Sequence, residues 1–502
     1  MDVLQRKTPF FIAGKVTVLH ACIVIALVVI AVAMRAVGLN GRFDFDGYDE
    51  GVYWQTLRAM SGGYHLYGQI FFSQPPLFLL SIYPFYALLG STIVSARIGV
   101  AALSLLGLLG AYLMGTALSG RLGGLAAVVI LMVTPIYLAQ SQALEAEGPA
   151  TAFLFLTVGA AFLWHERPTG RRAMVFAVIC GMTLSLGILL KLLDAIAVIP
   201  IVLLVAANIW HVRHETRPCF WANLLPIAAG LVAAVVAALI VSAPFLGSLN
   251  ALLQQTVTFH LAAEKVQIFP PSIERLGGFF ATNGVLCAVA MIGVIVAILR
   301  RDGRIVPLAG WLLATVIVLA IHAPVFQRHT LVLVPPLIAI IALGLNDLPA
   351  VTISRPIAWR YRAALLMGSL AAATVLVSIR ADYDHYRDLN ALAASPATQW
   401  IAAELDRVTA REQWVITDAQ FVAALANRET PPWLTDTSLM RIGSGFLTSG
   451  ELLQTAADLR VHAVLFANGH FTAAPVAGFH DWVADHFSLT QRYGNGVELW
   501  TR

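Results

Sequence analysis

Long apolar segments, repeated through most of the chain, constrain this sequence more than any other feature. Stretches of about 18 or more apolar residues recur, and each is long enough to cross a hydrocarbon core of roughly 30 Å. Hydrophobic residues make up 59% of the 502 residues and charged residues only 12%, whereas a soluble domain carries roughly 25% charged residues. The sequence therefore predicts an α-helical polytopic membrane protein and excludes a soluble enzyme.

The apolar pattern predicts eleven transmembrane helices. They cover about residues 16–38, 93–118, 122–139, 150–164, 173–190, 193–210, 221–243, 276–299, 305–322, 330–346 and 363–379. A further apolar piece, 76–90, follows two prolines and is too short to span a bilayer. We interpret this piece as a re-entrant or interfacial helix.

The distribution of arginines predicts the orientation of these helices. If the N-terminus is cytoplasmic, the short cytoplasmic loops hold a group of cations, as the positive-inside rule requires. These are Arg121, Arg167, Arg171, Arg172, Arg213, Arg217, Arg300, Arg301, Arg304, Arg355, Arg360 and Arg362. We therefore expect a multi-pass protein of a bacterial-type plasma (inner) membrane, with the C-terminal part outside the cytoplasm.

Composition divides the chain into two predicted domains. Residues 1–380 form the transmembrane module, which includes a first outer loop at 39–92 and a second at 244–275, and residues 381–502 form a soluble extracytoplasmic domain. In the second domain, Ser395 is placed to cap a helix at 397–409. Strand-like runs follow at 413–417 and 461–466. Alternating helices and strands predict a small α/β domain.

Acidic residues are concentrated in the first outer loop. Asp44, Asp46, Asp49 and Glu50 lie within seven residues, directly after a predicted membrane span. Paired carboxylates can supply a general base or a cation site, because crowding and burial raise the pKa of one member. A solvated acidic loop explains the same pattern, so the spacing alone leaves both interpretations open.

A second acidic site lies on the same predicted side of the membrane, at Glu145 and Glu147. Carboxylates near the membrane plane are costly unless they serve a function. The alternative is that one of them stabilises the N-terminus of the next helix. Two acidic sites facing one membrane surface favour a functional interpretation.

Cations also occur on this outer side, against the usual bias. Lys191 follows an apolar run and suits a phosphate group, although an ion pair with Asp194 or a snorkelling side chain is the alternative. Arg328 can bind a phosphate or diphosphate through its planar fork. The weaker candidates of the 244–275 loop are His260 and Lys265, and Arg97 lies near the outer end of a predicted span.

In this order, these elements resemble the GT-C superfamily of integral-membrane glycosyltransferases over about residues 16–350. Within that superfamily, the chain is similar to family 39-like bacterial enzymes, akin to protein O-mannosyltransferases and lipid A aminoarabinose transferases. The matching elements are Asp49-Glu50, Gln74-Pro75-Pro76-Leu77, Arg97, the Glu145/Glu147 loop, Gly187 to Lys191, and Arg328-His329 to Pro335-Pro336. Relatives usually carry His in place of Gln74 and Tyr in place of His329, so these two positions depart from the pattern.

The resemblance implies an inverting transfer of a sugar from a polyprenyl-phosphate donor on the extracytoplasmic face. It implies that Asp49 is the catalytic base and that Glu50 supports it. Glu145 and Glu147 would line the acceptor side. The implied ligands of the donor phosphate are Lys191, Arg328, His329 and Arg97, and the further loop candidates are Asp46, Gln74, His260 and Lys265.

The sequence leaves several alternatives open. A transporter or flippase of lipid-linked glycans, or a noncatalytic assembly partner with this fold, would carry similar helices, but we find no internal repeat of the kind that transporters show. The acceptor is a glycan, a lipid or a protein, membrane lipid is a second partner, and no nucleic acid is expected. Some members of the superfamily need a divalent cation such as Mg or Mn, and the metal stays unknown here. The tail domain either recognises an acceptor or anchors a partner.

Overall fold

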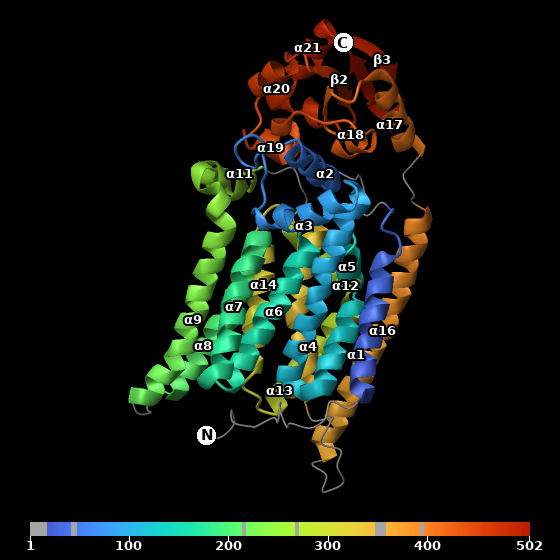
Figure 1. Ribbon diagram of the computed structural model, residues 1–502. Helices are drawn as coiled ribbons and strands as arrows, with labels where there is room; N and C mark the ends of the chain where they lie inside the picture. The colour runs from blue at the N-terminus through green and yellow to red at the C-terminus, as the bar shows by residue number, and fades with distance from the viewer. Residues whose placement is uncertain (1–17, 42–47, 213–216, 267–270, 347–357, 392–395) are drawn as a thin grey trace.

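The computed structural model describes residues 18–41, 48–212, 217–266, 271–346, 358–391 and 396–502. Its apolar helices form one upright bundle, with the C-terminal domain at one end (Figure 1). The bundle helices are α1 (Val18–Ala36), α4 (Ile93–Met132), α6 (Glu147–Glu166), α7 (Gly170–Leu190), α8 (Val198–Val212), α9 (Arg217–Ser242), α13 (Gly284–Leu299), α14 (Ile305–Ile321), α15 (Val334–Gly344) and α16 (Ala358–Ala391). The predicted α-helical membrane fold is confirmed.

Within the described residues, eight helical segments are long and apolar enough to span a membrane, or nine if one bent pair counts as a span. This count treats α4 as one helix, although non-helical backbone at Ser119 and Gly120 divides it where two predicted spans meet. It also leaves out α14, which has 17 residues. Each of the eleven predicted segments therefore coincides with helix in the structure.

Two expectations about element shape were wrong. The segment 276–299 is not one straight span, because α12 (Ser272–Thr282) meets α13 at an angle of 85°. The break falls at Asn283, whose backbone is not helical and which precedes a glycine. The segment 244–275 is not mainly a loop. It contains the short helices η2 (Ala243–Ser248), α10 (Leu249–Leu253), η3 (Gln254–Thr258) and α11 (Phe259–Ala263).

Two helices of the first outer segment lie across the end of the bundle that carries the C-terminal domain (Figure 1). They are α2 (Tyr48–Ser61) and α3 (Leu77–Leu88). The predicted short helix at 76–90 corresponds to α3, which begins directly after Pro76. Three further short elements lie at this end: α5 (Pro135–Gln140), η1 (Leu192–Ala197) and η4 (Gln327–Leu333). Most of the candidate site is built from these pieces.

Small residues let the bundle helices pack closely, as is usual where lipid removes the hydrophobic drive for association. A Cβ on Gly110 of α4 would lie 2.5 Å from the backbone of Leu156 in α6. Likewise, a Cβ on Gly181 of α7 would overlap the carbonyl of Gly230 in α9. The segments 147–166 and 327–344 are the most buried spans, each 83% buried. They form the rigid centre from which functional side chains can project.

The C-terminal domain contains a four-stranded sheet of order β1-β2-β4-β3. Its strands are β1 (Trp414–Thr417), β2 (Val461–Phe466), β3 (Ser488–Arg492) and β4 (Glu498–Thr501), and its main helices are α17 (Pro396–Val408), α18 (Gln420–Leu425), α19 (Leu439–Gly443), α20 (Ser449–Ala456) and α21 (Gly478–His486). Strands β1 and β2 are parallel, whereas β4 pairs antiparallel with both β2 and β3. The predicted helix and both predicted strands are present, while the proposed cap, Ser395, lies outside the described residues.

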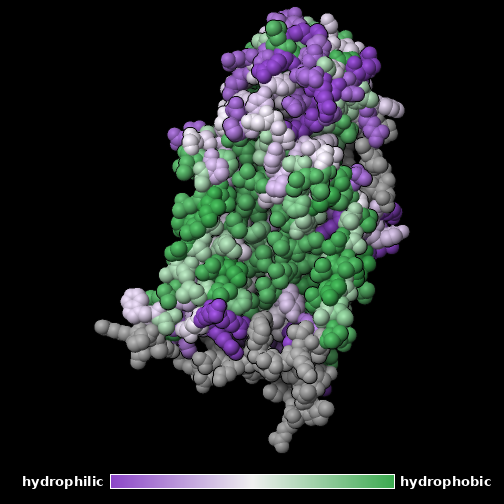
Figure 2. All heavy atoms as spheres, in the orientation of Figure 1, coloured by the Kyte–Doolittle hydropathy of each residue, from purple (hydrophilic) through white to green (hydrophobic). Residues whose placement is uncertain are grey.

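Hydropathy divides the surface in the same way as the fold (Figure 2). Hydrophobic residues cover the visible side of the bundle, and hydrophilic residues cover much of the C-terminal domain and part of the opposite end of the bundle. At that opposite end, Arg300 donates to the carbonyl of Gly344 and Arg304 donates to the carbonyl of Leu118. Several of the arginines on which the predicted orientation depends therefore lie at the end away from the C-terminal domain.

The C-terminal domain contacts the bundle mainly through α2. The backbones of α2 and α18 approach so closely that a Cβ on Gly51 would lie 2.2 Å from the amide nitrogen of Phe421. Trp54 packs edge-on against the ring of Phe421. Gln55 donates to the carbonyl of Arg428 at 2.9 Å. Close backbone contact and paired polar groups fix the domain on the bundle.

We predict that Gly51→Ala weakens this contact. The added methyl group meets backbone rather than a flexible side chain, and overpacking of this kind costs about 1–3 kcal/mol. We expect a lower unfolding temperature in detergent and faster proteolysis of the C-terminal domain. Gly68→Ala is the matched control, because a Cβ there has no heavy atom within 4 Å. Equal protease resistance in both variants would contradict the close packing of α2 against α18.

Candidate active site

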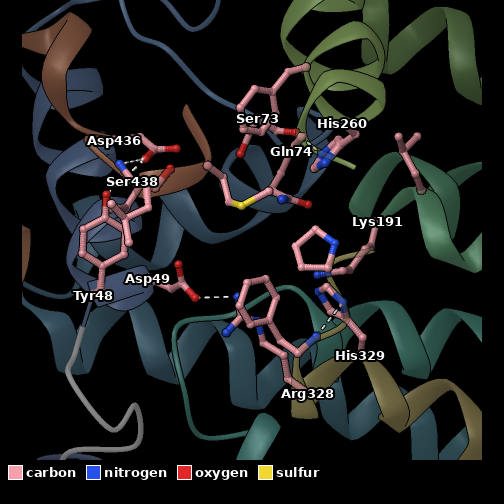
Figure 3. Close-up of a pocket in the computed structure, with 18 of the residues that line it drawn as sticks. Tyr48, Asp49, Ser73, Gln74, Lys191, His260, Arg328, His329, Asp436 and Ser438 are labelled. Atoms are coloured by element: carbon pink, nitrogen blue, oxygen red, sulfur yellow. Dashed lines mark hydrogen bonds and ion pairs between the residues drawn. The ribbon is translucent and has the colours of Figure 1, made fainter. Parts of the chain in front are cut away.

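A cavity of about 620 Å³ lies where the bundle, α2 and the C-terminal domain meet. Its polar lining comes from segments far apart in the sequence (Figure 3). The polar and charged lining residues are Tyr48, Asp49, Tyr53, Ser73, Gln74, Lys191, His260, His322, Arg328, His329, Asp436, Ser438 and His470. The structure therefore brings together residues from the predicted outer loops and from the tail.

Neighbouring acids at the start of α2 have different surroundings. Glu50 is fully buried, and its carboxylate forms an ion pair with Arg97 of α4. The same carboxylate accepts the backbone N–H of Leu144 at 2.5 Å. Asp49, by contrast, lines the cavity. Adjacent positions on α2 thus carry one carboxylate that is buried in an ion pair and one that faces the cavity.

Arg328 is the centre of an ion-pair network beside the cavity. Its guanidinium lies 2.5 Å from the carboxylate of Asp49, 3.1 Å from that of Glu145 and 3.3 Å from that of Glu147. The ring of Phe326 packs against the guanidinium with its centroid 4.6 Å away. Arg328 is the second residue of the segment that leads into buried helix α15, and Glu147 begins buried helix α6. The two most buried spans therefore hold this network in place.

Lys191 lies at the junction between α7 and η1, and it is mostly buried. Its ammonium group forms an ion pair with Glu147, whose carboxylate also lies 3.7 Å from His329. Among the described residues, Lys191 forms no ion pair with Asp194, the alternative partner considered from the sequence. Lys191 and Arg328 together, with His329 beside them, are called the cationic wall below (Figure 3).

Other predicted site residues fall into two groups. Gln74 and His260 line the cavity, and the His260 ring is hydrogen-bonded to the carbonyl of Ser73 at 2.9 Å. Lys265 is exposed and does not line the cavity. Asp46 lies outside the described residues.

Arg97 does not reach the cavity either. Its side chain is 1% exposed and, besides Glu50, it donates to the backbone carbonyls of Leu39 and Gly41. This geometry agrees neither with a phosphate ligand nor with an arginine that faces lipid headgroups. A buried guanidinium needs an anion and several acceptors, and Arg97 has both within the protein.

Sequence reasoning missed the part of the cavity that the C-terminal domain supplies. We call this part the cavity roof, and it consists of Asp436, Ser438, Leu439, Met440 and His470. The only signal in the sequence is a short polar run, Thr435-Asp436-Thr437-Ser438, which is typical of any turn. Nothing in that run indicates that it faces the membrane module.

Two tyrosines of α2 line the cavity: Tyr48 is buried and Tyr53 is partly buried. Burial, followed by the charge of Asp436, raises the pKa of Tyr48 well above its ordinary value. Burial, followed by the charge of Asp49, raises the pKa of Tyr53 in the same direction. Both phenols therefore stay protonated at neutral pH and can donate hydrogen bonds.

Within the part of the chain that the structure describes, no group of three or more His, Cys, Asp or Glu side chains is arranged to hold a metal ion. The cavity instead combines two carboxylates, those of Asp49 and Asp436, with the basic side chains of Lys191 and Arg328 and several further hydrogen-bonding groups. Such a set can remove a proton from one molecule and stabilise negative charge on another.

Comparisons with known proteins agree with this architecture. Residues 73–243 match the family described as dolichyl-phosphate-mannose-protein mannosyltransferase. No curated protein sequence matches the chain. Structures of ArnT from Cupriavidus metallidurans, in the apo state and bound to undecaprenyl phosphate, have TM-scores of 0.63. Their sequences are 15% and 16% identical to this chain, and each match covers 95% of this chain and 97% of ArnT.

A more distant likeness concerns the archaeal oligosaccharyltransferase AglB from Archaeoglobus fulgidus, solved with an inhibitory peptide and a dolichol-phosphate. Its TM-score is 0.50 at 14% identity, over 92% of this chain and 70% of AglB. At these identities, the structural matches show the fold. Together with the family match over residues 73–243, they agree with the resemblance that the sequence predicts, and they show that this chain has the fold of ArnT and AglB.

Proposed function

We propose that this protein transfers a sugar from a polyprenyl-phosphate donor to an acceptor, with Asp49 as the base. One observation carries the proposal: the cavity places the carboxylate of Asp49 beside the cationic wall, so that a proton acceptor and phosphate-binding groups share one space. ArnT was solved with undecaprenyl phosphate and AglB with a dolichol-phosphate. These lipid phosphates, bound by proteins of the same fold, support a donor of that class.

The proposed reaction is a single displacement. Asp49 takes the proton of the acceptor hydroxyl or amine as that atom forms a bond to the anomeric carbon. The bond between the anomeric carbon and the phosphate oxygen breaks, and the lipid phosphate leaves with the electron pair. Lys191 and Arg328 stabilise the added negative charge, which is where fixed cations are most effective. Attack opposite the leaving group inverts the anomeric configuration.

The ion pairs beside the cavity suggest how the base becomes available. Arg328 is shared among three carboxylates, those of Asp49, Glu145 and Glu147. A donor phosphate competes with Asp49 for this guanidinium, because Arg binds phosphate through the same planar fork. In the proposed sequence, donor binding draws Arg328 toward the phosphate and leaves the Asp49 carboxylate able to accept a proton.

The orientation in the membrane is part of the proposal. The cavity lies at the end of the bundle opposite Arg300 and Arg304, and the positive-inside rule assigns such arginines to the cytoplasm. We therefore place the cavity and the C-terminal domain on the extracytoplasmic side. A long lipid tail on the donor explains why the cavity opens beside a membrane bundle.

We predict that Asp49→Asn abolishes most transfer while preserving donor binding. Loss of a general base costs about 10²–10⁴-fold in rate. The amide removes a negative charge beside Arg328, so the affinity for undecaprenyl phosphate should be equal or higher. Transfer would be measured with radiolabelled polyprenyl-phosphate sugars and a cell-envelope extract, and binding by native mass spectrometry.

Asp481→Asn is the matched control, because its side chain is 91% exposed on the C-terminal domain. Full transfer by a folded Asp49→Asn protein would overturn the assignment of the base. If the wild-type protein moves no sugar from any donor in the panel, the transferase itself is the wrong proposal, and transport or assembly becomes the better explanation.

We predict that Lys191→Met weakens binding of the lipid phosphate and lowers the transfer rate by about 10²–10³-fold, the usual effect of removing one group that stabilises developing charge. Lys265→Met is the control, because this lysine is exposed outside the cavity. Undecaprenyl phosphate without a sugar is the binding probe. Equal affinities in the two variants would show that Lys191 serves only to hold Glu147.

A further inference from the structure

The cavity roof contains a loop, residues 435–438, that is fixed from three directions. From α2, the hydroxyl of Tyr48 donates to Oδ1 of Asp436 at 3.2 Å and accepts the N–H of Thr437 at 3.0 Å. From β1, the carbonyl of Thr417 accepts the hydroxyl of Thr437 at 3.0 Å. From the loop after β2, the ring of His470 bonds the carbonyl of Thr437 at 3.0 Å. A loop that served only as a connection would not need this many constraints.

A buried arginine fixes the far side of the same loop. The Arg441 guanidinium donates to the carbonyls of Trp433 and Asp436, each at 2.6 Å. It also stacks on the ring of Phe71 from the first outer segment, 3.8 Å from the ring centroid. Burial lowers the pKa of Arg441 to about 10, so the side chain remains charged at neutral pH. The loop is therefore preorganised by both domains.

The position of the loop within the α/β domain also points to binding. It lies at the carboxyl ends of the parallel strands β1 and β2, where open α/β sheets bind their ligands. Asp418, directly after β1, accepts the backbone N–H groups of Ala467, Asn468 and His470 at 2.8, 3.1 and 2.9 Å. This carboxylate fixes the loop that carries His470. The ligand-binding edge of the sheet thus faces the cavity.

Three polar groups of the roof retain unused hydrogen-bonding capacity among the described residues. Oδ1 of Asp436 accepts Tyr48 and the N–H of Ser438, while Oδ2 has no partner. The oxygen of Ser438 accepts the N–H of Arg441, which leaves its hydroxyl proton to donate. His470 donates Nδ1–H to a carbonyl, so its Nε2 can accept. The roof offers two acceptors and one donor without a cation.

This chemistry complements hydroxyl groups and not a phosphate. A phosphate belongs at the cationic wall, where Lys191 and Arg328 lie, and the roof lies elsewhere on the same cavity (Figure 3). Resting on the proposed function, we infer that Asp436, with Ser438 and His470, binds the hydroxyl groups of the donor's sugar and selects which sugar is transferred. The C-terminal domain would thereby determine which sugar donor the transferase accepts.

The test separates sugar recognition from phosphate binding. Asp436→Asn keeps the oxygen that accepts Tyr48 and Ser438 and replaces the unpartnered Oδ2 by an amide donor. We expect affinity for bare undecaprenyl phosphate to stay within about twofold of wild type. Affinity for the preferred undecaprenyl-phosphate sugar should fall about 10- to 100-fold, as for a lost hydrogen bond to a charged group. The kcat/KM ratio between different sugar donors should change by a similar factor.

Ser438→Gly is the second variant, because glycine at a helix N-cap costs only a few tenths of a kcal/mol. It removes the hydroxyl donor and should weaken sugar-donor binding several-fold without affecting the bare lipid phosphate. Asp481→Asn is the control in the same domain, and the unfolding temperature of each variant reports folding.

The outcomes distinguish this inference from the proposed function. If both roof variants bind and discriminate donors as wild type does, the inference fails while the transferase stands. The inference is also overturned if the roof variants change only the KM of the acceptor. It is likewise overturned if they lose as much affinity for bare undecaprenyl phosphate as for the sugar donor. Absence of any sugar transfer or sugar-donor binding by the wild-type protein overturns the proposed function and this inference together.

Discussion

The buried ion pair between Glu50 and Arg97 is the interaction on which the site most depends. It joins α2 to α4, and through the carbonyls of Leu39 and Gly41 it also holds the chain that leaves α1. Removing one partner of a buried pair leaves an uncompensated charge and typically costs about 3–5 kcal/mol. Because Glu50 points into the protein, the rotation of α2 is fixed and its neighbour Asp49 lines the cavity.

The positions of the other side chains at the cavity depend on the rigid elements that carry them. The segments that start at Glu147 and Gln327 are the most buried spans, and they carry Glu147 and Arg328 at the ends nearest the cavity. Above them, the C-terminal domain is fixed by its close contact with α2. The Asp49 carboxylate, the cationic wall and the cavity roof therefore border one cavity although they come from separate parts of the chain. Preorganisation of this kind is what makes electrostatic stabilisation effective.

Much of the fold could be predicted, because the membrane imposes strong rules on sequence. Apolar length identified each of the bundle segments, and the break in α4 at Gly120 agreed with the boundary between two predicted spans. The bend at Asn283 was missed, since hydropathy reports apolar length and carries no information about direction. The helical segment 243–263 was missed because Pro, Gly and polar residues interrupt its apolar residues, and such a pattern resembles a loop.

For the site, the sequence by itself determined the chemical inventory: acids at 49–50 and 145–147, cations at 191 and 328, and a resemblance that indicates which of them act together. Only the tertiary structure decided how each is used. Glu50 and Arg97 are buried as an ion pair, whereas Asp49 faces the cavity. Lys191 forms its ion pair with Glu147 and not with Asp194. The sequence could not indicate that Asp436, Ser438 and His470 line the cavity, because the contacts of Asp436 and His470 with Tyr48 of α2 span about four hundred residues and depend on how the two domains dock.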